Sequence, residues 1–147
     1  KERSFGLTSY RRFHLAFPVN DLNTTKNFYE NVLECKVGRE SENWIDFNLY
    51  GHQIVAHLAP EECNDVNSNI VDEDQIPCRH FGVILDWNEW KELSNKLDLY
   101  GIKYLINPKI RFKNRSGEQG TFFIKDPSGN IIEFKTFKKE SDVFKKF

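Results

Sequence analysis

Four side chains in this sequence are of the types that bind and use a divalent metal ion: His14, His57, His80 and Glu133. The three histidines lie in apolar stretches that are typical of β-strands, FHLAF, VAHL and RHFGV. Two imidazoles and one carboxylate form the smallest set that holds such an ion and leaves coordination positions open for a substrate. Each side chain alone is more often an ordinary strand residue, so the metal hypothesis depends on the fold that positions them.

The carboxylate of this set lies in an expected β-hairpin, residues 120–136, with the sequence GTFFIKDPSGNIIEFKT. Two apolar runs flank the turn sequence DPSG, in which proline fixes φ and glycine accepts a left-handed conformation. Glu133 interrupts the second run. A carboxylate there either faces solvent or is held inside by a partner that offsets its desolvation, such as a metal ion.

The remaining elements repeat one order, βαβββ, in the two halves of the chain. The first half predicts strands at residues 13–19, 36–39, 44–49 and 53–58, with a helix that Asp21 caps and that runs to about residue 33. The second half predicts a strand at 79–85, a helix capped by Asp86 or Asn88 and ended by Gly101, a strand at 102–106, a polar loop at 111–119 and the hairpin. The stretch 60–78 has no apolar period and is predicted to be a linker or a mobile loop.

This internal repeat gives the metal hypothesis more weight, because equivalent positions of two copies are expected to face each other across a pseudo-twofold axis. Aligning the first strands places His14 over His80. Aligning the fourth strands, VAHL over IIEF, places His57 over Glu133. The fold class expected from the pattern is α+β.

The sequence resembles the vicinal oxygen chelate superfamily over about residues 12–137. The segments that carry the resemblance are FHLAFPVNDLNTTKNFYENVL, RHFGVIL and FFIKDPSGNIIEF. This superfamily includes glyoxalase I, fosfomycin and bleomycin resistance proteins and extradiol dioxygenases. The resemblance implies that the tandem βαβββ modules form a curled mixed sheet, a cup with helices outside. It also implies a single domain, 1–147, with modules at about 12–59 and 79–137, a linker at 60–78 and a basic tail at 138–147.

Carried onto the matching positions, the resemblance implies that His14, His80 and Glu133 are the metal ligands. His57 matches a position where glyoxalase I has a glutamate ligand and base, so His57 is a candidate fourth ligand, general base or hydrogen-bond donor. The family's ion accepts two adjacent substrate oxygens and stabilises the negative charge that develops.

Three functions follow from this inventory. With Fe(II), the favoured ion, we expect an oxidoreductase similar to extradiol dioxygenases. With Ni, Zn or Mn and a nearby base, we expect a lyase or isomerase similar to glyoxalase I. The third alternative is a non-catalytic protein that binds a small molecule, as bleomycin resistance proteins do, although such members generally lack the metal set.

Five further residues are candidates for contact with the substrate. Tyr104 is a possible proton donor, and Arg111 is a possible partner for a carboxylate or another anion. Weaker candidates are His52, Trp44 and Phe122, which are more often structural.

The composition limits the classes of partner and the cellular compartment that we expect. The 147 residues carry a formal net charge of −1, which argues against a nucleic-acid or membrane partner. The three cysteines, an odd number with no CxxC pair, favour a reducing, cytoplasmic location. The sequence begins without methionine, which is consistent with a processed start. The resemblance further implies a homodimer.

Overall fold

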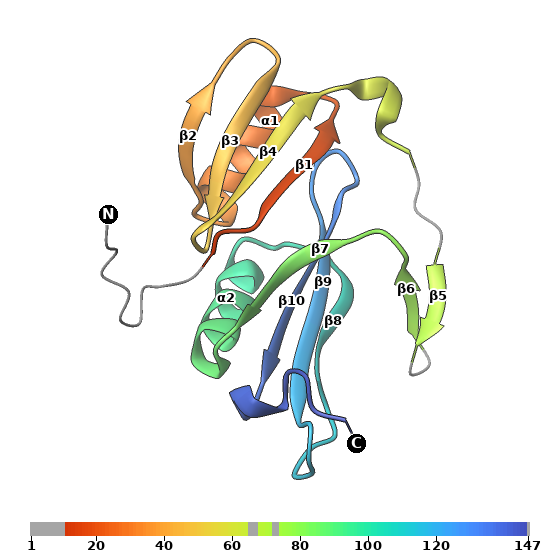
Figure 1. Ribbon diagram of the computed structural model, residues 1–147. Coiled ribbons are helices and arrows are strands. Elements are labelled where there is room, and N and C mark those ends of the chain that lie inside the picture. Colours follow the sequence, from red (N-terminus) through yellow and green to blue (C-terminus); the bar gives the residue numbers. More distant parts are fainter. Residues whose placement is uncertain (1–10, 65–67, 72–73, 147) are drawn as a thin grey trace, which may run out of the picture. The chain divides into compact units, whose positions relative to one another are not determined.

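The computed structural model describes residues 11–64, 68–71 and 74–146, and the chain divides into two compact units, Lys1–Pro60 and Glu61–Phe147. Each unit contains a four-stranded mixed sheet and a helical segment (Figure 1). The strand order is β1-β4-β3-β2 in the first sheet and β7-β10-β9-β8 in the second. Because the two orders are the same permutation of four strands, the predicted α+β fold with two tandem βαβββ modules is confirmed.

The first unit follows the predicted order closely. Its strands are β1 (His14–Val19), β2 (Lys36–Glu40), β3 (Trp44–Leu49) and β4 (His52–Leu58). β1 and β4 are parallel, and the other pairs are antiparallel. The helix α1 (Leu22–Asn27) continues as a π-helical segment, η2 (Phe28–Val32). Asp21 caps α1 as predicted, since its carboxylate accepts a hydrogen bond from the Thr24 N–H at 2.8 Å.

Successive side chains of a strand point to opposite faces, so the buried residues identify the core side of the first sheet. Phe17, Phe47 and Ile54 are buried on the face that packs against the helical segment. Tyr29 of η2 is fully buried there, with its ring 5.6 Å from that of Phe17 and 5.1 Å from that of Phe47. Residues of the opposite parity, including His14 and Gln53, lie on the other face.

The second unit repeats the arrangement. Its main elements are β7 (Phe81–Leu85), α2 (Trp87–Leu99), β8 (Tyr104–Arg111), β9 (Gln119–Lys125) and β10 (Ile131–Phe137). Of the two caps predicted for α2, Asp86 is the one used. It forms a reciprocal capping box with Glu89. Gly101 follows the helix with a φ of 69°, a conformation in which glycine is not strained.

The core of the second unit lies between its sheet and α2. Trp90, Phe122 and Phe134 are buried, and the Phe122 ring lies 5.6 Å from Trp90 and 5.4 Å from Phe134. The Trp90 indole N–H donates a hydrogen bond to the Phe134 carbonyl at 2.8 Å. This contact fixes α2 against β10, the strand that carries Glu133.

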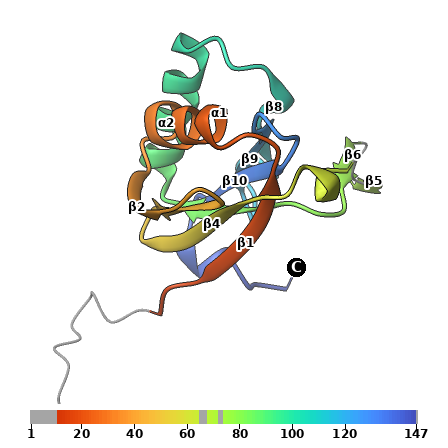
Figure 2. The ribbon, with the colours of Figure 1, turned by 90° about the horizontal axis from the view of Figure 1, so that it is seen from above.

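The structure differs from the sequence prediction in three segments. The strand predicted at 102–106 continues as β8 to Arg111. The stretch predicted as a linker contains η3 (Pro60–Glu62) and a two-stranded sheet of β5 (Ser68–Val71) and β6 (Asp74–Pro77), which lie side by side in Figures 1 and 2. In the predicted basic tail, η4 (Glu140–Asp142) buries Asp142, whose carboxylate accepts a hydrogen bond from the Gly117 N–H at 3.0 Å.

Within the described residues, no helix has the length and apolar character needed to cross a membrane.

Candidate metal site

The position of Glu133 is set by the hairpin of β9 and β10. The predicted turn forms, and the Asp126 carboxylate organises it. This buried carboxylate accepts hydrogen bonds from the Ser128 N–H at 2.9 Å, the Asn130 N–H at 2.8 Å and the Asn130 side-chain amide at 2.9 Å. The turn fixes the register in which Glu133 lies opposite Phe123 and Lys135 lies opposite Thr121.

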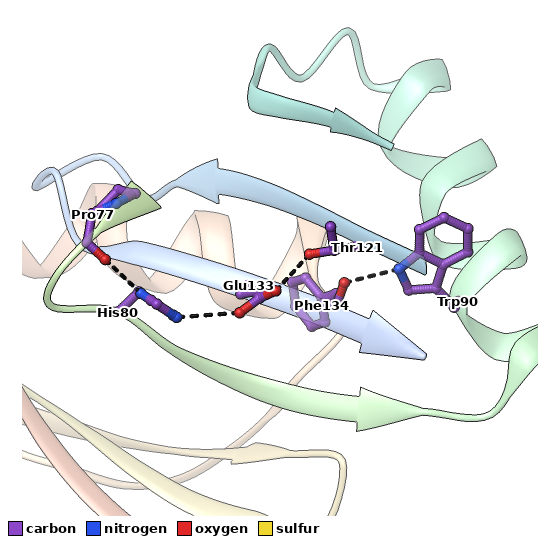
Figure 3. Close-up of polar contacts among 6 residues, drawn as sticks. All are labelled: Pro77, His80, Trp90, Thr121, Glu133 and Phe134. Atoms are coloured by element: carbon purple, nitrogen blue, oxygen red, sulfur yellow. Dashed lines mark hydrogen bonds and ion pairs between the residues drawn. The ribbon is translucent and has the colours of Figure 1, made fainter. Parts of the chain in front are cut away.

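The Glu133 carboxylate has two described partners (Figure 3). One oxygen, Oε2, accepts a hydrogen bond from the Thr121 hydroxyl at 2.6 Å. The other oxygen, Oε1, lies 3.2 Å from His80 Nε2. The Glu133 side chain is only 14% exposed, so these contacts replace most of the water that a free carboxylate would hold.

His80, which directly precedes β7, is oriented by the backbone. Its Nδ1 lies 2.8 Å from the Pro77 carbonyl oxygen, as Figure 3 shows. A carbonyl oxygen can only accept, so Nδ1 carries the hydrogen and Nε2 is the atom that faces Glu133. The imidazole also packs edge-on against Phe123, with ring centroids 5.1 Å apart. The ring is therefore held in one orientation.

The contact between the two side chains perturbs both titrations. The hydrogen bond with Glu133 raises the pKa of His80 above its ordinary value, and the Pro77 bond adds to this increase, while burial opposes it. Burial alone would raise the pKa of Glu133. Hydrogen bonds from His80 and Thr121, together with the nearby Lys135 charge, hold this pKa below its ordinary value instead.

The His80–Glu133 pair fits one edge of a metal coordination shell. Ligand atoms at about 2.1 Å from one ion, at an angle of about 100°, lie about 3.2 Å apart. The Nε2–Oε1 distance is 3.2 Å. The far atoms of both side chains are already hydrogen-bonded, as is usual for metal ligands. Within each unit, the described residues contain no group of three or more His, Cys, Asp and Glu side chains arranged for a metal ion.

His14 and His57 lie in the first unit. His14 begins β1, and its Nδ1 lies 2.8 Å from the side-chain oxygen of Gln53 on β4. His57 is exposed near the end of β4, opposite Trp44 of β3 and Pro18 of β1. His57 lies four residues after Gln53 on β4, so both side chains point to the same face of the sheet, the one that carries His14.

The strand registers correct the predicted equivalence of His57 and Glu133. Glu133 lies opposite Gly82, two residues after His80. The residue opposite Ala16, two residues after His14, is Val55. Val55 is therefore the counterpart of Glu133 in the first module. The counterpart of His57, which lies opposite Pro18, is Lys135, because Lys135 lies opposite Ile84.

The predicted substrate contacts of the second unit fall on different faces of its sheet. Tyr104 and Phe122 lie on the α2 face, opposite to the face of Glu133. The Tyr104 hydroxyl contacts the Ser94 carbonyl and the Asp98 carboxylate, each at 2.9 Å, and burial raises the pKa of Tyr104. Arg111 lies on the same face of the sheet as Glu133. Lys109, two residues before Arg111, pairs with Thr121, which lies on that face, and side chains two residues apart along a strand point to the same side.

Arg111 and Lys109 both contact Asp74 of β6. The Arg111 guanidinium lies 3.6 Å from the Asp74 carboxylate, and Lys109 forms an ion pair with the same oxygen. These contacts connect the β5–β6 sheet to β8. They also place two cationic side chains on the Glu133 face of the second sheet.

The two weaker candidates of the first unit have different surroundings. His52 has a structural contact, because its Nδ1 accepts a hydrogen bond from the Phe13 N–H at 2.9 Å. Trp44 is half-buried beside His57, and the Arg39 guanidinium carbon lies 5.4 Å from the centroid of its ring.

Three residues that support the predicted ligands were not among those predicted from the sequence. Thr121 and Gln53 contact Glu133 and His14 directly, and Asp46 contacts Gln53. For Thr121 a signal existed: once the DPSG turn is assigned, counting outward along the hairpin places residue 121 diagonally beside residue 133. The Gln53 contact depends on the register of the parallel β1–β4 pair, which no local turn determines.

Comparison with known proteins identifies relatives of the chain. A sequence profile of the Glyoxalase/Bleomycin resistance protein/Dioxygenase superfamily matches residues 11–134. Among solved structures, a glyoxalase/bleomycin resistance protein/dioxygenase from Alicyclobacillus acidocaldarius is 29% identical, with a TM-score of 0.73 over 91% of this chain and 96% of that chain.

Two more distant structures share the fold. The fosfomycin resistance protein FosX from Listeria monocytogenes is 15% identical, with a TM-score of 0.65 over 86% of this chain and 93% of that chain. A lactoylglutathione lyase from Agrobacterium tumefaciens is 16% identical, with a TM-score of 0.60 over 86% of this chain and 92% of that chain. At these identities the two similarities establish the fold alone.

Proposed function

The chain belongs to the Glyoxalase/Bleomycin resistance protein/Dioxygenase superfamily, and from this membership we propose that it is a metal-dependent enzyme acting on a small substrate with two adjacent oxygens. The observation that carries the proposal is the His80–Glu133 pair. Its facing atoms are 3.2 Å apart, and its outer atoms are already held by Pro77 and Thr121. Preorganisation of this kind lowers the cost of ordering the ligands when an ion binds.

In this proposal His80 and Glu133 are joined by His14 as protein ligands, and Fe(II) is the favoured ion, with Ni, Zn and Mn as alternatives. A bound ion supplies Lewis acidity toward the two substrate oxygens. The protein residues orient the substrate, and Arg111 on the Glu133 face is the proposed partner for an anionic substrate group. A valine at the counterpart of Glu133 supports a set with one carboxylate, which suits oxidative cleavage similar to that of extradiol dioxygenases.

A second candidate function is a lyase or isomerase similar to glyoxalase I. The observation that favours it is His57, an exposed imidazole on the same face of its sheet as His14. A neutral imidazole in this position is suited to moving a proton between adjacent substrate carbons. His57 is then a general base rather than a fourth ligand.

Metal content tests whether either enzyme proposal holds. The protein is purified without oxygen, reconstituted separately with iron, nickel, manganese and zinc, and measured by elemental analysis. Wild type is expected to retain about one ion per chain, and His80→Ala and Glu133→Gln are expected to lose it. Glu92→Gln, an exposed substitution on α2, is the matched control and should retain the ion. Absence of bound metal in wild type under all four conditions would refute both enzyme functions and favour a non-catalytic binding protein.

Turnover separates the two enzyme functions. Oxygen uptake with a panel of catechols by the iron-loaded protein supports oxidative cleavage. Turnover of a glutathione hemithioacetal by the nickel- or zinc-loaded protein, with no oxygen uptake, supports the lyase. Fosfomycin belongs in the panel because a solved relative is a fosfomycin resistance protein. Under the lyase proposal, His57→Ala should abolish turnover and retain the metal. Unchanged turnover in this variant would remove His57 from the site.

We also propose a homodimer in a reducing, cytoplasmic compartment. The family resemblance supports the dimer. Cys35, Cys63 and Cys78 are not joined in disulfides, which is consistent with the compartment. Sedimentation equilibrium tests the stoichiometry, and fractionation of cells that produce the protein tests the location.

A further inference from the structure

A buried carboxylate in the first unit has contacts that the proposed chemistry does not explain. Asp46 of β3 is only 8% exposed. Its Oδ2 lies 3.5 Å from the side-chain nitrogen of Gln53 and 3.7 Å from Nε of Arg39, whose side chain is mostly exposed. The side-chain oxygen of Gln53 in turn lies 2.8 Å from His14 Nδ1. Burying a carboxylate costs folding free energy, which points to a specific role for Asp46.

The register of the sheet places these three residues side by side. Gln53 lies opposite His14 in the parallel β1–β4 pair. Asp46 lies opposite Val55, two residues from Gln53 along β4 and on the same face. We call these residues the Asp46–Gln53–His14 network. All its members lie in the first unit, on the face opposite to the core.

The chemistry of these groups favours one arrangement of hydrogens. An ionised carboxylate only accepts hydrogen bonds, so the amide nitrogen of Gln53 faces Asp46. The reversed amide would place its oxygen against the Asp46 oxygen, and the two acceptors would repel each other. With the nitrogen toward Asp46, the Gln53 oxygen faces His14 and accepts a hydrogen bond. His14 Nδ1 must therefore carry the hydrogen, so Nε2 is the nitrogen that has the lone pair in the neutral imidazole.

At His80 the orientation of the ring is set by a different device. There the Pro77 carbonyl accepts from Nδ1 at 2.8 Å, and Nε2 faces the Glu133 carboxylate at 3.2 Å. Both proposed histidine ligands thus present Nε2. At His80 a backbone oxygen holds Nδ1. At His14 a side chain does so, and a side chain requires a second group to orient it.

We propose that Gln53, oriented by Asp46, is a positioning residue that fixes His14 in the Nδ1–H tautomer and so presents its Nε2 to a divalent ion. The part of this inference that concerns the ion rests on the proposed function. The part that concerns the tautomer does not. Removal of such supporting hydrogen bonds from other metal sites lowers metal affinity by about 10–100-fold.

The tautomer is measured in metal-free protein labelled with 15N-histidine, by two-bond 1H–15N correlation at about pH 8.5, where ordinary imidazoles are neutral. His14 is expected to show the Nδ1–H form in wild type. In Gln53→Leu, His14 should lose this form while the His80 signals stay as they are in wild type, so His80 is an internal control. In Asp46→Asn the amide at residue 53 is no longer constrained, and His14 should show a mixture of tautomers. Gln75→Leu, an exposed substitution on β6, should leave both residues unchanged.

Metal affinity is measured on the same proteins by calorimetric titration with Zn(II) and Ni(II). Gln53→Leu is expected to bind about 10–100-fold more weakly than wild type. A wild-type His14 in the Nε2–H form, or a tautomer that does not respond to Gln53→Leu, would overturn the inference about the network. Unchanged affinity in Gln53→Leu would overturn its metal-presenting role. If no protein in the series binds metal while the His14 tautomer responds, the proposed function fails and the network is supported.

Discussion

The hydrogen bond between Thr121 and Glu133 yields a sharp test of how the carboxylate is held. Thr121→Val replaces the hydroxyl by a methyl group of nearly the same size. The distance of 2.6 Å lies in the range of a hydrogen bond to a charged oxygen, which contributes about 1.5–3 kcal/mol. Because the Glu133 side chain is 14% exposed, water replaces part of the lost bond. We expect a loss near the lower limit, about 1.5 kcal/mol.

The assay is urea unfolding of the metal-free protein at pH 7. With a slope of about 2 kcal/mol/M, this loss lowers the midpoint by about 0.75 M. Thr136→Val is the matched control on the other face of the same sheet. Thr136 is fully buried, and its hydroxyl has no hydrogen-bond partner among the described residues. Removing an unsatisfied hydroxyl should raise the stability by about 1 kcal/mol.

Both substitutions replace a hydroxyl by a methyl group, so the opposite signs of their expected changes in unfolding free energy form the test. Equal losses for both variants would show that the Thr121 bond adds nothing beyond packing, and the argument for a preorganised Glu133 would fail. Thr121→Ser, which keeps the hydroxyl, should retain most of the bond. Zn(II) affinity provides a second measurement, and we expect a decrease of about 10-fold in Thr121→Val and none in Thr136→Val.

Three other substitutions test the surrounding structure. Gly82→Ala would place a Cβ 1.6 Å from the Glu133 carbonyl oxygen, so we expect β7 and β10 to separate, a loss of about 3 kcal/mol in urea unfolding and a loss of bound metal. Asp126→Ala removes the acceptor of three hydrogen bonds in the turn and should cost about 2–3 kcal/mol, with hydrogen exchange increasing first at the Ser128 and Asn130 amides. Burial raises the pKa of the Cys35 thiol to about 12, so the folded state holds this proton more tightly than the unfolded state, and stability falls as the pH rises above about 9. Wild type should therefore lose about 1 kcal/mol more than Cys35→Ala between pH 8 and pH 10, and an equal loss in both proteins would contradict the assignment.

Much of the fold could be predicted because local rules determine it. Asp21 and Asp86 cap the two helices as their sequence positions indicate, and the DPSG turn forms the hairpin. The β5–β6 sheet was missed because its strands are four residues long and carry few apolar residues. Asp74 connects it to β8 by pairing with Lys109 and Arg111. Ion pairs between segments far apart in the sequence leave no periodic pattern.

The equivalence of His57 and Glu133 was wrong for a different reason. Side chains alternate with a period of two, so sliding a strand by two residues keeps every apolar residue on the same face. VAHL fits over IIEF as well by pattern as the true alignment does. Only the hydrogen-bonded register distinguishes the two, by placing Val55 opposite Ala16 and Glu133 opposite Gly82. In contrast, the contact of His80 with Glu133 within the second unit joins two residues that the sequence had already singled out as candidates.

The equivalence of residues 55 and 133 has a consequence for the design of this protein. The two modules match in fold but differ at this position. Here one copy holds a carboxylate at residue 133, and the other holds a buried apolar side chain at residue 55. Val55→Glu would make the two copies alike at this position through a single amino-acid exchange. Residue 55 is thus the natural place to begin converting a scaffold with one carboxylate into one with two.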